Sequence, residues 1–209
     1  MAHKPKMNRV LVIGMPGGGK STLSAELSRR LGLPLYHLDR LFWKPKWEQT
    51  PDNEFEKIQA DLISRDRWII DGSYTRTLGL RLTRADTVIH LDFARWLCLY
   101  RITKRVVTSY GKVRPDMGED CPEHFDWEFY RWVWNYRRNH RPRIYDLLYE
   151  AQDRLNIVTL TKPSDVTLFL EQLAPAKSQA QSAKSKLIFK SAPSFTRRTP
   201  SRRKKRARA

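Results

Sequence analysis

The sequence predicts an α/β fold in which a five-stranded parallel sheet carries helices on both faces. Short apolar runs alternate along the chain with longer segments whose apolar residues recur at helical spacing. The apolar runs are mostly continuous, which is typical of strands that a parallel sheet buries on both faces. Each of the first four runs ends in glycine or aspartate. Because α/β folds bind ligands at the carboxyl ends of their strands, we expect a binding site there.

The expected strands are the short runs that stop at a turn residue or a carboxylate. RVLVIG ends in Gly14, LPLYHLD in Asp39, RWIIDG in Gly72 and DTVIHLD in Asp92, and NIVTL follows near the end of the domain. The strands are predicted at 9–14, 33–39, 67–72, 86–92 and 156–160.

Helices are expected between these strands. The first begins at Lys20 and stops at Gly32, a residue type that ends helices readily. Thr50 followed by Pro51 is a favourable start for the second, and Asp92 is expected to cap the helix after the fourth strand. A loop is expected at 110–122, and further helices at 125–139, 143–155 and 163–173.

The positive charge is concentrated at the C-terminal end of the chain. The net charge is +18, and residues 176–209 contain 12 Lys and Arg and no acid. Because this segment is poor in apolar residues, we expect a disordered basic tail. It either binds a polyanion such as nucleic acid or is a solvated extension. We expect one domain over 9–175, preceded by a short basic extension at 1–8.

Composition also bears on location and on metal chemistry. No apolar run approaches the roughly 18 residues that a membrane-spanning helix needs, and the basic N-terminus leads straight into the first strand, so we expect a cytoplasmic protein. Cys98 falls in an apolar helical pattern, where a buried, unreactive thiol is expected. Cys121 and His124 form one ligand-like pair with no second pair after it, which argues against zinc.

The stretch GMPGGGKST, residues 14–22, links the first strand to the first helix. It has the spacing G-x-x-x-x-G-K-[ST] of a P-loop, in the structural context that this motif requires. Glycines let backbone N–H groups approach phosphate oxygens, the lysine reaches the β- and γ-phosphates, and the next hydroxyl ligates Mg²⁺. ATP and Mg²⁺ are therefore the expected cofactors. The predicted nucleotide-binding residues are Gly14, Pro16, Gly17, Gly18, Gly19, Lys20, Ser21 and Thr22, of which Lys20 is also catalytic and Ser21 a metal ligand.

GMPGGGKST and IIDGSYTRT, residues 69–77, together resemble the adenylate kinase and shikimate kinase group of P-loop kinases. The resemblance implies that Asp71 holds the Mg²⁺ shell through water and that residues 108–124 form a short lid. The pair in RITKR is similar to the arginines that lead into that lid, so Arg101 is expected to bind the nucleotide and Arg105 to be catalytic. Arginines on the returning helix would supply a further phosphate contact, and Arg137 is the catalytic residue expected there.

A narrower resemblance covers about residues 9–173. The segments HLDRLFWKPKW, WIIDGSY, ADTVIHLD and RPDMGEDCPEHFD, with the tryptophan-rich helix after them, are similar to the DNA topology modulation proteins (FlaR-type). This resemblance implies an adenylate kinase-like fold and ATP binding, and it identifies no phosphate acceptor. It also stops before the basic tail, so it supports neither interpretation of that tail.

Three aspartates compete for roles at the strand ends. Asp92 ends an apolar run in the pattern of a Walker B carboxylate, whereas Asp71 is followed by a glycine that allows close backbone approach. We favour Asp71 as the metal ligand, because capping the next helix is a sufficient role for Asp92. By resemblance to the shikimate kinase-like branch, Asp39 is predicted to orient or deprotonate the acceptor. The alternative is a helix cap or a salt bridge to Arg40 or Lys44.

Aromatic residues offer less specific signals. FWKPKW, residues 42–47, either stacks bases, closes over a small acceptor, or packs as an aromatic cluster on the next helix. Trp132 and Trp134 are two positions apart, so we expect one in the core and the other facing the lid or the acceptor. His90 lies inside a strand and is expected to be a buried, satisfied histidine.

Two functions fit these residues. The first is a P-loop kinase that transfers the γ-phosphoryl group of ATP, with Mg²⁺, to a nucleotide or small hydroxyl acceptor. The second is a nucleic-acid-binding ATPase that uses ATP as a switch and its basic tail to contact DNA or RNA. We favour the kinase, because kinase-like residues stand at the strand ends. The resemblance to adenylate kinases would make Arg76 a monophosphate-binding residue, but DGSYTRT departs from their pattern at Ser73 and Tyr74, where Phe-Pro is usual, so that role does not carry over directly.

Overall fold

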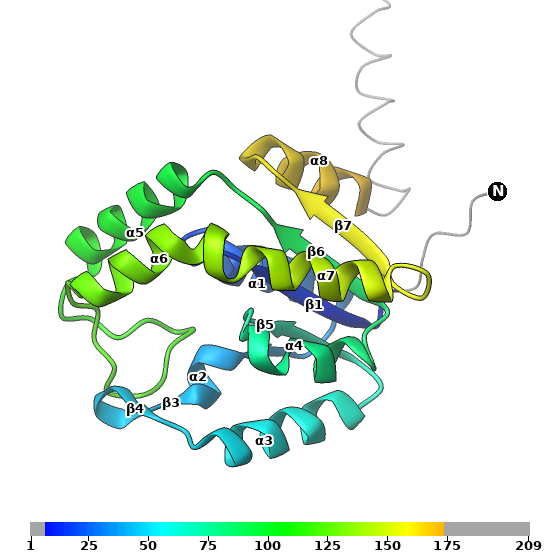
Figure 1. Cartoon of the computed structure of the whole chain (residues 1–209), viewed down its shortest axis with the longest axis horizontal. Helices are drawn as coiled ribbons and strands as arrows, with labels where there is room; N and C mark the ends of the chain where they lie inside the picture. The colour runs from blue at the N-terminus through cyan, green and yellow to red at the C-terminus, as the bar shows by residue number, and fades with distance from the viewer. Residues whose placement is uncertain (1–6, 174–209) are drawn as a thin grey trace, which may run out of the picture. The chain divides into compact units, whose positions relative to one another are not determined.

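The computed structural model describes residues 7–173, so the predicted basic tail and most of the predicted N-terminal extension lie outside the described residues. Five parallel strands form one sheet in the order β2-β5-β1-β6-β7. The predicted α/β architecture is confirmed (Figure 1). The strands are β1 (Arg9–Gly14), β2 (Leu35–His37), β5 (Trp68–Asp71), β6 (Thr87–Leu91) and β7 (Asn156–Leu160).

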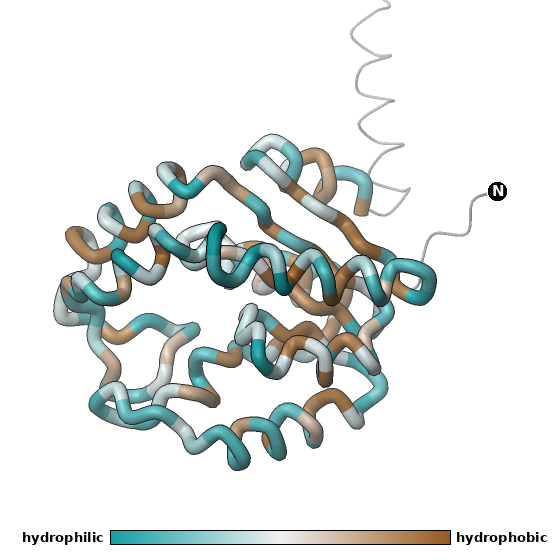
Figure 2. Tube along the Cα trace, viewed as in Figure 1, coloured by the Kyte–Doolittle hydropathy of each residue, from teal (hydrophilic) through white to brown (hydrophobic). Residues whose placement is uncertain are grey.

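The centre of the sheet is apolar because its middle strands are covered on both faces. The side chains from Val10 to Ile13 in β1 and from Trp68 to Ile70 in β5 are fully buried. Figure 2 shows the hydrophobic colour gathered on these strands and on the helix sides that face them. Within β1, Val12 pairs with Asp71 and Gly14 with Leu91, so the carboxyl ends of three neighbouring strands meet at one edge of the sheet.

Helices cover both faces of this sheet. Helix α1 (Lys20–Leu31) packs on β1, β2 and β5 through Leu23 and Leu27, which lie one turn apart. In Figure 1, α6 (Trp127–Asn139) and α7 (Arg141–Ala151) cross the opposite face. The other long helices are α3 (Asp52–Ser64), α5 (Arg95–Ser109) and α8 (Pro163–Leu173). Between residues 7 and 173, no helix has the length and apolar character needed to cross a membrane.

The segment after β2 differs from the prediction. β2 ends at His37, so Asp39 lies in a short helix, α2 (Leu38–Phe42), instead of closing the strand. A tight hairpin follows, made of β3 (Trp43–Lys44), the 3₁₀ turn η1 (Pro45–Trp47) and β4 (Glu48–Gln49). Lys46 and Trp47 adopt φ of 61° and 62°, which residues other than glycine rarely do.

The helices differ from the prediction in one additional helix and in two expected caps. Helix α4 (Thr75–Leu82) was not predicted, because TRTLGLRL contains a glycine and two threonines and has no capping side chain. Asp92 does not cap α5, which begins at Arg95 without a side-chain cap. Thr50 does not cap α3 either, since its hydroxyl donates to the Leu41 carbonyl.

The lid segment, which we define as residues 110–126, packs on the β3–β4 hairpin (Figure 1). The Lys46 N–H donates to the Asp120 carbonyl at 3.1 Å, and Cys121 Sγ donates to the Lys44 carbonyl at 3.3 Å. A Cβ at Gly118 would lie 2.0 Å from the Trp43 carbonyl oxygen. The segment predicted as a lid is therefore seated on the hairpin, and this contact tolerates only glycine at position 118.

Candidate active site

A large cleft lies at the carboxyl ends of β1, β2 and β5. It is lined by the glycine-rich loop, by α2 and the hairpin, by the turn after β5 and by the lid segment. Its volume of ≈ 1960 Å³ exceeds the roughly 300–1,000 Å³ of a typical small-molecule pocket. The cleft therefore has room for a nucleotide and for a second molecule beside it.

The glycine-rich loop has a backbone shape that demands glycine at key positions. The φ angle is 140° at Gly14, 76° at Gly17 and 90° at Gly19, in the region that side chains disfavour. A Cβ at Gly14 would lie 2.3 Å from the Leu91 carbonyl oxygen, and one at Gly17 would lie 2.4 Å from that of Cys98. β6 and α5 therefore pack directly on the loop and fix its path into α1.

Positive groups surround this loop. Helix α1 begins at Lys20 with no acid in its first turn and no side-chain cap, so its N-terminal N–H groups are available to an anion. Lys20 Nζ donates to the Met15 carbonyl at 3.4 Å. Arg101 donates to the Gly18 carbonyl at 3.1 Å and lies over the Phe93 ring. The arrangement is an anion-binding site of the kind found at helix N-termini.

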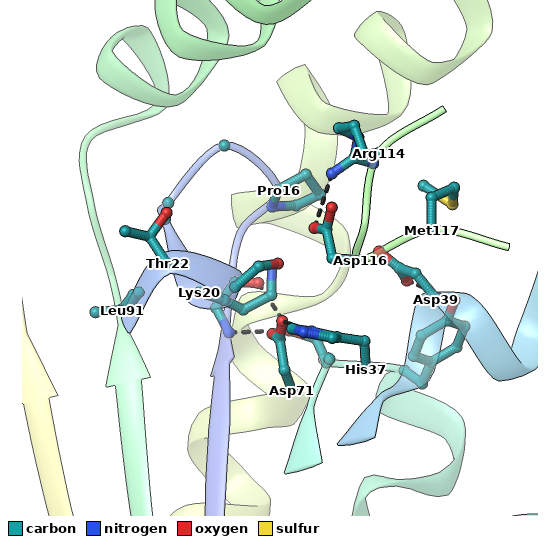
Figure 3. A pocket seen from close by; sticks show the side chains of 18 of the residues that line it. Pro16, Lys20, Thr22, His37, Asp39, Asp71, Leu91, Arg114, Asp116 and Met117 are labelled. Atoms are coloured by element: carbon teal, nitrogen blue, oxygen red, sulfur yellow. Dashed lines mark hydrogen bonds and ion pairs between the residues drawn. The ribbon is translucent and has the colours of Figure 1, made fainter. Parts of the chain in front are cut away.

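Asp71 and His37 lie beside Lys20 (Figure 3). His37 Nδ1 and Asp71 Oδ2 are 2.9 Å apart. The other oxygen, Asp71 Oδ1, is buried and has no hydrogen-bond partner among the described residues. Such an oxygen suits Mg²⁺, which prefers oxygen ligands and keeps several waters. Within residues 7–173 no three His, Cys, Asp or Glu side chains form a ready-made metal cluster, so any Mg²⁺ would depend on the nucleotide for further ligands.

Asp92 is engaged away from the cleft. Its carboxylate accepts hydrogen bonds from Arg141 at 2.7 Å and from the Tyr145 hydroxyl at 2.9 Å. Burial raises the pKa of Asp92, but these bonds and the Arg141 charge outweigh it and lower the pKa overall. Because both oxygens have partners and the residue is not part of the cleft lining, Asp92 has a structural role that its strand-end pattern does not reveal.

Asp39 lines the cleft from α2. The Tyr74 hydroxyl donates to Asp39 Oδ1 at 2.7 Å. Burial raises the pKa of Asp39, while the charge of Lys20 and the bond from Tyr74 limit the rise. Lys44, one of the alternative partners considered for Asp39, pairs with Glu54 instead. The carboxyl group is therefore positioned by a neutral hydroxyl and is directed toward the same space as Lys20 (Figure 3).

The turn that carries Tyr74 is held by Arg81 from α4. Arg81 is fully buried and donates to the carbonyls of Gly72 at 2.7 Å and Tyr74 at 3.0 Å, and also to that of Ser73. On the other side of the turn, the Ser73 hydroxyl bonds both the N–H and the carbonyl of Gly14. Arg81 and Ser73 thus connect the glycine-rich loop to the Tyr74–Asp39 pair.

Two arginines of the lid region share one buried acid. Arg105, near the end of α5, contacts Glu123 at 3.1 Å, and Arg114 contacts the same carboxylate. Arg114 also pairs with Asp116 at 2.9 Å, and the two side chains lie beside Pro16 of the glycine-rich loop in Figure 3. Burial raises the pKa of Asp116, but the Arg114 charge and a hydrogen bond from Ser21 outweigh it and lower the pKa. Arg114 and Asp116 of the lid segment thus line the same cleft as the glycine-rich loop.

The part of the cleft between α2 and the hairpin is lined by an aromatic wall, which we define as Phe42, Trp43, Trp47, Phe55 and Tyr74. Ring centroids are 5.0 Å apart for Phe42 with Phe55, Trp43 and Tyr74, and 5.4 Å apart for Trp43 with Trp47. The FWKPKW segment is therefore an aromatic cluster packed on α3, and it lines the cleft as well.

Arg137 does not reach this cleft. It lies 3.9 Å from Asp92 and is not among the lining residues, whereas Tyr136 is. The two are consecutive on α6, and consecutive helical residues point about 100° apart. The sequence places an arginine on the right helix but does not place its side chain toward the cleft.

The two tryptophans of α6 are both partly exposed. Trp132 and Trp134 are each 41% exposed, so the expectation that one lies in the core is wrong. Trp132 lines the cleft, and Trp134 packs on Trp96.

Cys98 is fully buried as predicted, and burial raises the pKa of its thiol. His90 is buried as predicted, with its pKa lowered by burial to about 4, but its Nδ1 has no partner among the described residues, so it is not satisfied.

Several site residues were missed by the sequence reasoning. His37 stands at a strand end two positions before Asp39, and Arg114 and Asp116 flank a proline inside the expected lid. Both patterns were available as signals, because polar residues at strand ends and in lids of such folds face ligands. Arg81 gave none, since an arginine on an amphipathic helix is ordinarily taken for a surface residue.

A central parallel strand, a glycine-rich loop at its carboxyl end and the helix that follows define a P-loop NTPase fold. Comparison with solved structures agrees. A shikimate kinase from Acinetobacter baumannii, in complex with shikimate, matches with a TM-score of 0.54 and 13% identity over 81% of this chain and 92% of that chain. A shikimate kinase from Bacteroides thetaiotaomicron matches with a TM-score of 0.49 and 14% identity over 80% and 96%. At this identity the first likeness establishes the fold alone, and the second, with a TM-score below 0.5, adds nothing to that conclusion. No protein-family model and no curated protein matches the chain.

Proposed function

We propose that this protein is a P-loop kinase that transfers the γ-phosphoryl group of ATP to a hydroxyl of a small acceptor, with Mg²⁺. One observation carries the proposal: the glycine-rich loop and the Asp39 carboxyl group line the same cleft, beneath one lid segment. A phosphate-binding loop alone would serve any ATPase. A carboxyl group opposite it, in a space large enough for a second molecule, suits transfer to an acceptor.

The proposed ATP-binding elements are the backbone of residues 14–22, Lys20 and the arginines around them. N–H groups at the start of α1 would bind the phosphates, and Lys20 would reach the β- and γ-phosphates. Arg101, already at the Gly18 carbonyl, would contact the nucleotide. Arg105 and Arg114, held by Glu123, would neutralise the charge that develops on the transferring group.

The residues that would hold Mg²⁺ are Ser21 and Asp71. Asp71 supplies a buried carboxylate oxygen without a partner among residues 7–173, and Ser21 stands where the P-loop places its metal-binding hydroxyl. When bound, Mg²⁺ would neutralise charge on the β- and γ-phosphates. His37 orients Asp71 from the side away from that oxygen.

Asp39 is proposed as the general base. The acceptor hydroxyl oxygen would attack the γ-phosphorus, the bond from that phosphorus to the β-bridging oxygen would break, and the hydroxyl proton would pass to Asp39. A carboxylate whose pKa is raised by burial accepts a proton more readily than an ordinary aspartate. Tyr74 would keep the carboxylate oriented.

The test is ADP release from Mg²⁺–ATP by the full chain, with and without candidate acceptors. The panel should contain nucleosides, nucleoside monophosphates, sugars and shikimate, because a solved structure of like fold is a complex with shikimate. Lys20→Ala is the blank. We expect acceptor-dependent ADP release that Lys20→Ala abolishes. ADP release that no acceptor changes would contradict the proposal.

A second candidate function, nucleic-acid binding coupled to slow ATP hydrolysis, is favoured by the outer side of α5. Trp96 and Tyr100 are 67% and 64% exposed there, and α5, which contains no acid, has Arg95 and Lys104 outside the cleft lining. Exposed aromatics between cations can stack bases. The 12 Lys and Arg of residues 176–209, with no acid among them, favour the same function. ADP release stimulated by single-stranded DNA, and lost in Trp96→Ala, would favour this function over the kinase.

A further inference from the structure

The cleft is acidic although the protein is strongly basic. The chain carries a net charge of +18, yet the cleft lining contains eight Asp and Glu against six Lys and Arg. The positive groups lie mainly at the glycine-rich loop and the lid segment, where the phosphates of ATP would pair with them. The remaining part, beside Asp39 and the aromatic wall, therefore offers little uncompensated positive charge to a second ligand.

The arginines that line the cleft are already engaged. Arg76, the arginine at the aromatic wall, points both terminal nitrogens at the two carboxylate oxygens of Asp52. Arg29 pairs with Glu26 on α1. A phosphate or carboxylate on the acceptor would have to displace Asp52 from Arg76, and the displaced acid would remain nearby.

Arg105 and Arg114 are held in the same way at the lid. Both contact Glu123, which is 5% exposed, and Arg114 also contacts Asp116. A guanidinium group that a buried carboxylate holds is positioned for the transferring phosphoryl group and is not free to follow an acceptor. Asp39, on the acceptor side, adds a further acidic group.

The aromatic wall supplies a different kind of contact. Five aromatic side chains line this part of the cleft, and the Tyr74 hydroxyl already donates a hydrogen bond to Asp39. Aromatic faces bind the apolar faces of sugar rings and stack on bases, whereas they gain nothing from an anionic group. Hydroxyl recognition falls to Asp39, which can accept from an acceptor hydroxyl as it accepts from Tyr74.

We propose that the acceptor is an uncharged cyclic hydroxyl compound, a nucleoside or a sugar, and that the Arg76–Asp52 pair excludes its phosphorylated or carboxylated counterparts. The inference rests on the proposed kinase function and narrows it. It disfavours nucleoside monophosphates as acceptors, although the sequence alone is compatible with them. Nucleosides and sugars share the chemistry that this part of the cleft recognises, and the experiment separates them.

The test uses matched pairs that differ only in charge. The full chain is loaded with Mg²⁺ and a non-transferable ATP analogue, and binding of each pair is measured by calorimetry. The natural nucleosides are compared with their 5′-monophosphates, and common hexoses and pentoses with their phosphates and acids. We expect an uncharged member to bind at least tenfold more tightly than its anionic counterpart. Which series binds distinguishes a nucleoside from a sugar.

Two variants connect the preference to the ion pair. Asp52→Asn frees Arg76 in the cleft and is expected to raise the relative affinity for the anionic member at least tenfold. Adding Arg76→Ala to Asp52→Asn should remove that gain. Asp61→Asn is the matched control, because it frees Arg65 from an exposed pair outside the cleft lining and should leave the ratio unchanged.

Each outcome decides the inference. Tighter binding of an anionic member by the wild-type protein, no binding of any nucleoside or sugar, or a ratio that Asp52→Asn leaves unchanged would overturn it. Because the measurement uses a non-transferable analogue, it does not depend on phosphoryl transfer. Preferential binding of an uncharged member without ADP release from ATP would therefore contradict the proposed kinase and leave the preference standing.

Discussion

The two halves of the cleft are built by different means. At the glycine-rich loop, backbone geometry dominates: three glycines with positive φ shape the chain, and the start of α1 supplies N–H groups. At the aromatic wall, side chains dominate: rings packed edge to face, a hydroxyl that donates to a carboxylate, and an arginine paired with an aspartate. Backbone geometry is general to phosphates, whereas side-chain geometry selects one compound among many.

The difference predicts which changes each half tolerates. A methyl group added to the phosphate-binding half meets backbone that cannot move, so one atom should abolish function. A polar change in the acceptor half should alter rate or preference and leave ATP binding intact. The four predictions below test this contrast, beginning with the largest expected effect.

The largest effect is expected for Gly17→Ala. The new Cβ would lie 2.4 Å from the Cys98 carbonyl oxygen, and φ at this position is 76°. Both features disfavour any side chain, so the loop must change shape. We expect ATP affinity, measured with a fluorescent nucleotide, to fall by more than about 100-fold, in keeping with several kcal/mol of lost phosphate contacts.

Gly79→Ala is the matched control for that experiment. Gly79 lies in α4, its nearest neighbour to a new Cβ is a side-chain atom at 3.9 Å, and alanine is the better helix former. It should bind ATP like the wild type and melt at the same or a higher temperature. Wild-type ATP affinity in Gly17→Ala would mean that the loop does not hold phosphate in the way we infer.

The next effect is expected for Asp39→Asn. The amide keeps the size of the side chain but accepts no proton, so acceptor-dependent ADP release should fall by about 10²–10⁴-fold, the usual contribution of a general base. ATP affinity should stay within about threefold, because this residue lies in the acceptor half. Loss of ATP affinity together with rate would place Asp39 in the phosphate-binding half and break the comparison.

A smaller effect is expected where the halves meet. Gly118→Ala puts a Cβ 2.0 Å from the Trp43 carbonyl oxygen and should lift the lid segment from the hairpin. We expect KM for the acceptor to rise about tenfold and ADP release without acceptor to increase, since an open site admits water. Gly79→Ala, outside the lid segment and with a side-chain atom at 3.9 Å as the nearest neighbour of the new Cβ, should change neither value by more than about twofold. Equal effects of both would count against lid closure.

The same contrast explains how far the sequence could be interpreted. The phosphate-binding half follows from local rules: a glycine spacing between a strand and a helix fixes both conformation and ligand, and the fold around it follows from apolar periodicity. Asp71 was predictable for the same reason, because the strand end places it beside the loop. The fold and the glycine-rich loop therefore needed no tertiary information.

The acceptor half required the structure. Tyr74 meets Asp39 across 35 residues, Arg76 meets Asp52 across 24, and Arg81 is buried through bonds to three carbonyls of a turn. No local pattern encodes these pairings, because they depend on where α2, α3 and α4 are placed. At Asp92 a local pattern was present but misleading. The pattern indicated a helix cap or a metal ligand, whereas the carboxylate pairs with Arg141, which is remote in the sequence.

The smallest effect is expected for Tyr74→Phe, and it concerns pH. Burial raises the pKa of Asp39, and the hydrogen bond from Tyr74 works against that rise by stabilising the ionised form. Without the hydroxyl the pKa should move further up. Since a general base must be ionised, kcat/KM should rise with pH through this pKa, and its acid limb should lie at higher pH in Tyr74→Phe. The plateau at high pH should stay within about twofold of the wild type.

Tyr145→Phe is the matched control for the pH profile. It removes an equivalent hydroxyl from an aspartate, Asp92, which lies outside the cleft lining. The Asp92 pair contributes to structure, so this variant should lose some thermal stability and keep the wild-type acid limb. A limb that shifts in Tyr145→Phe, or that moves to lower pH in Tyr74→Phe, would mean that the titrating group is not Asp39. A shift confined to Tyr74→Phe would instead tie proton transfer to the acceptor half.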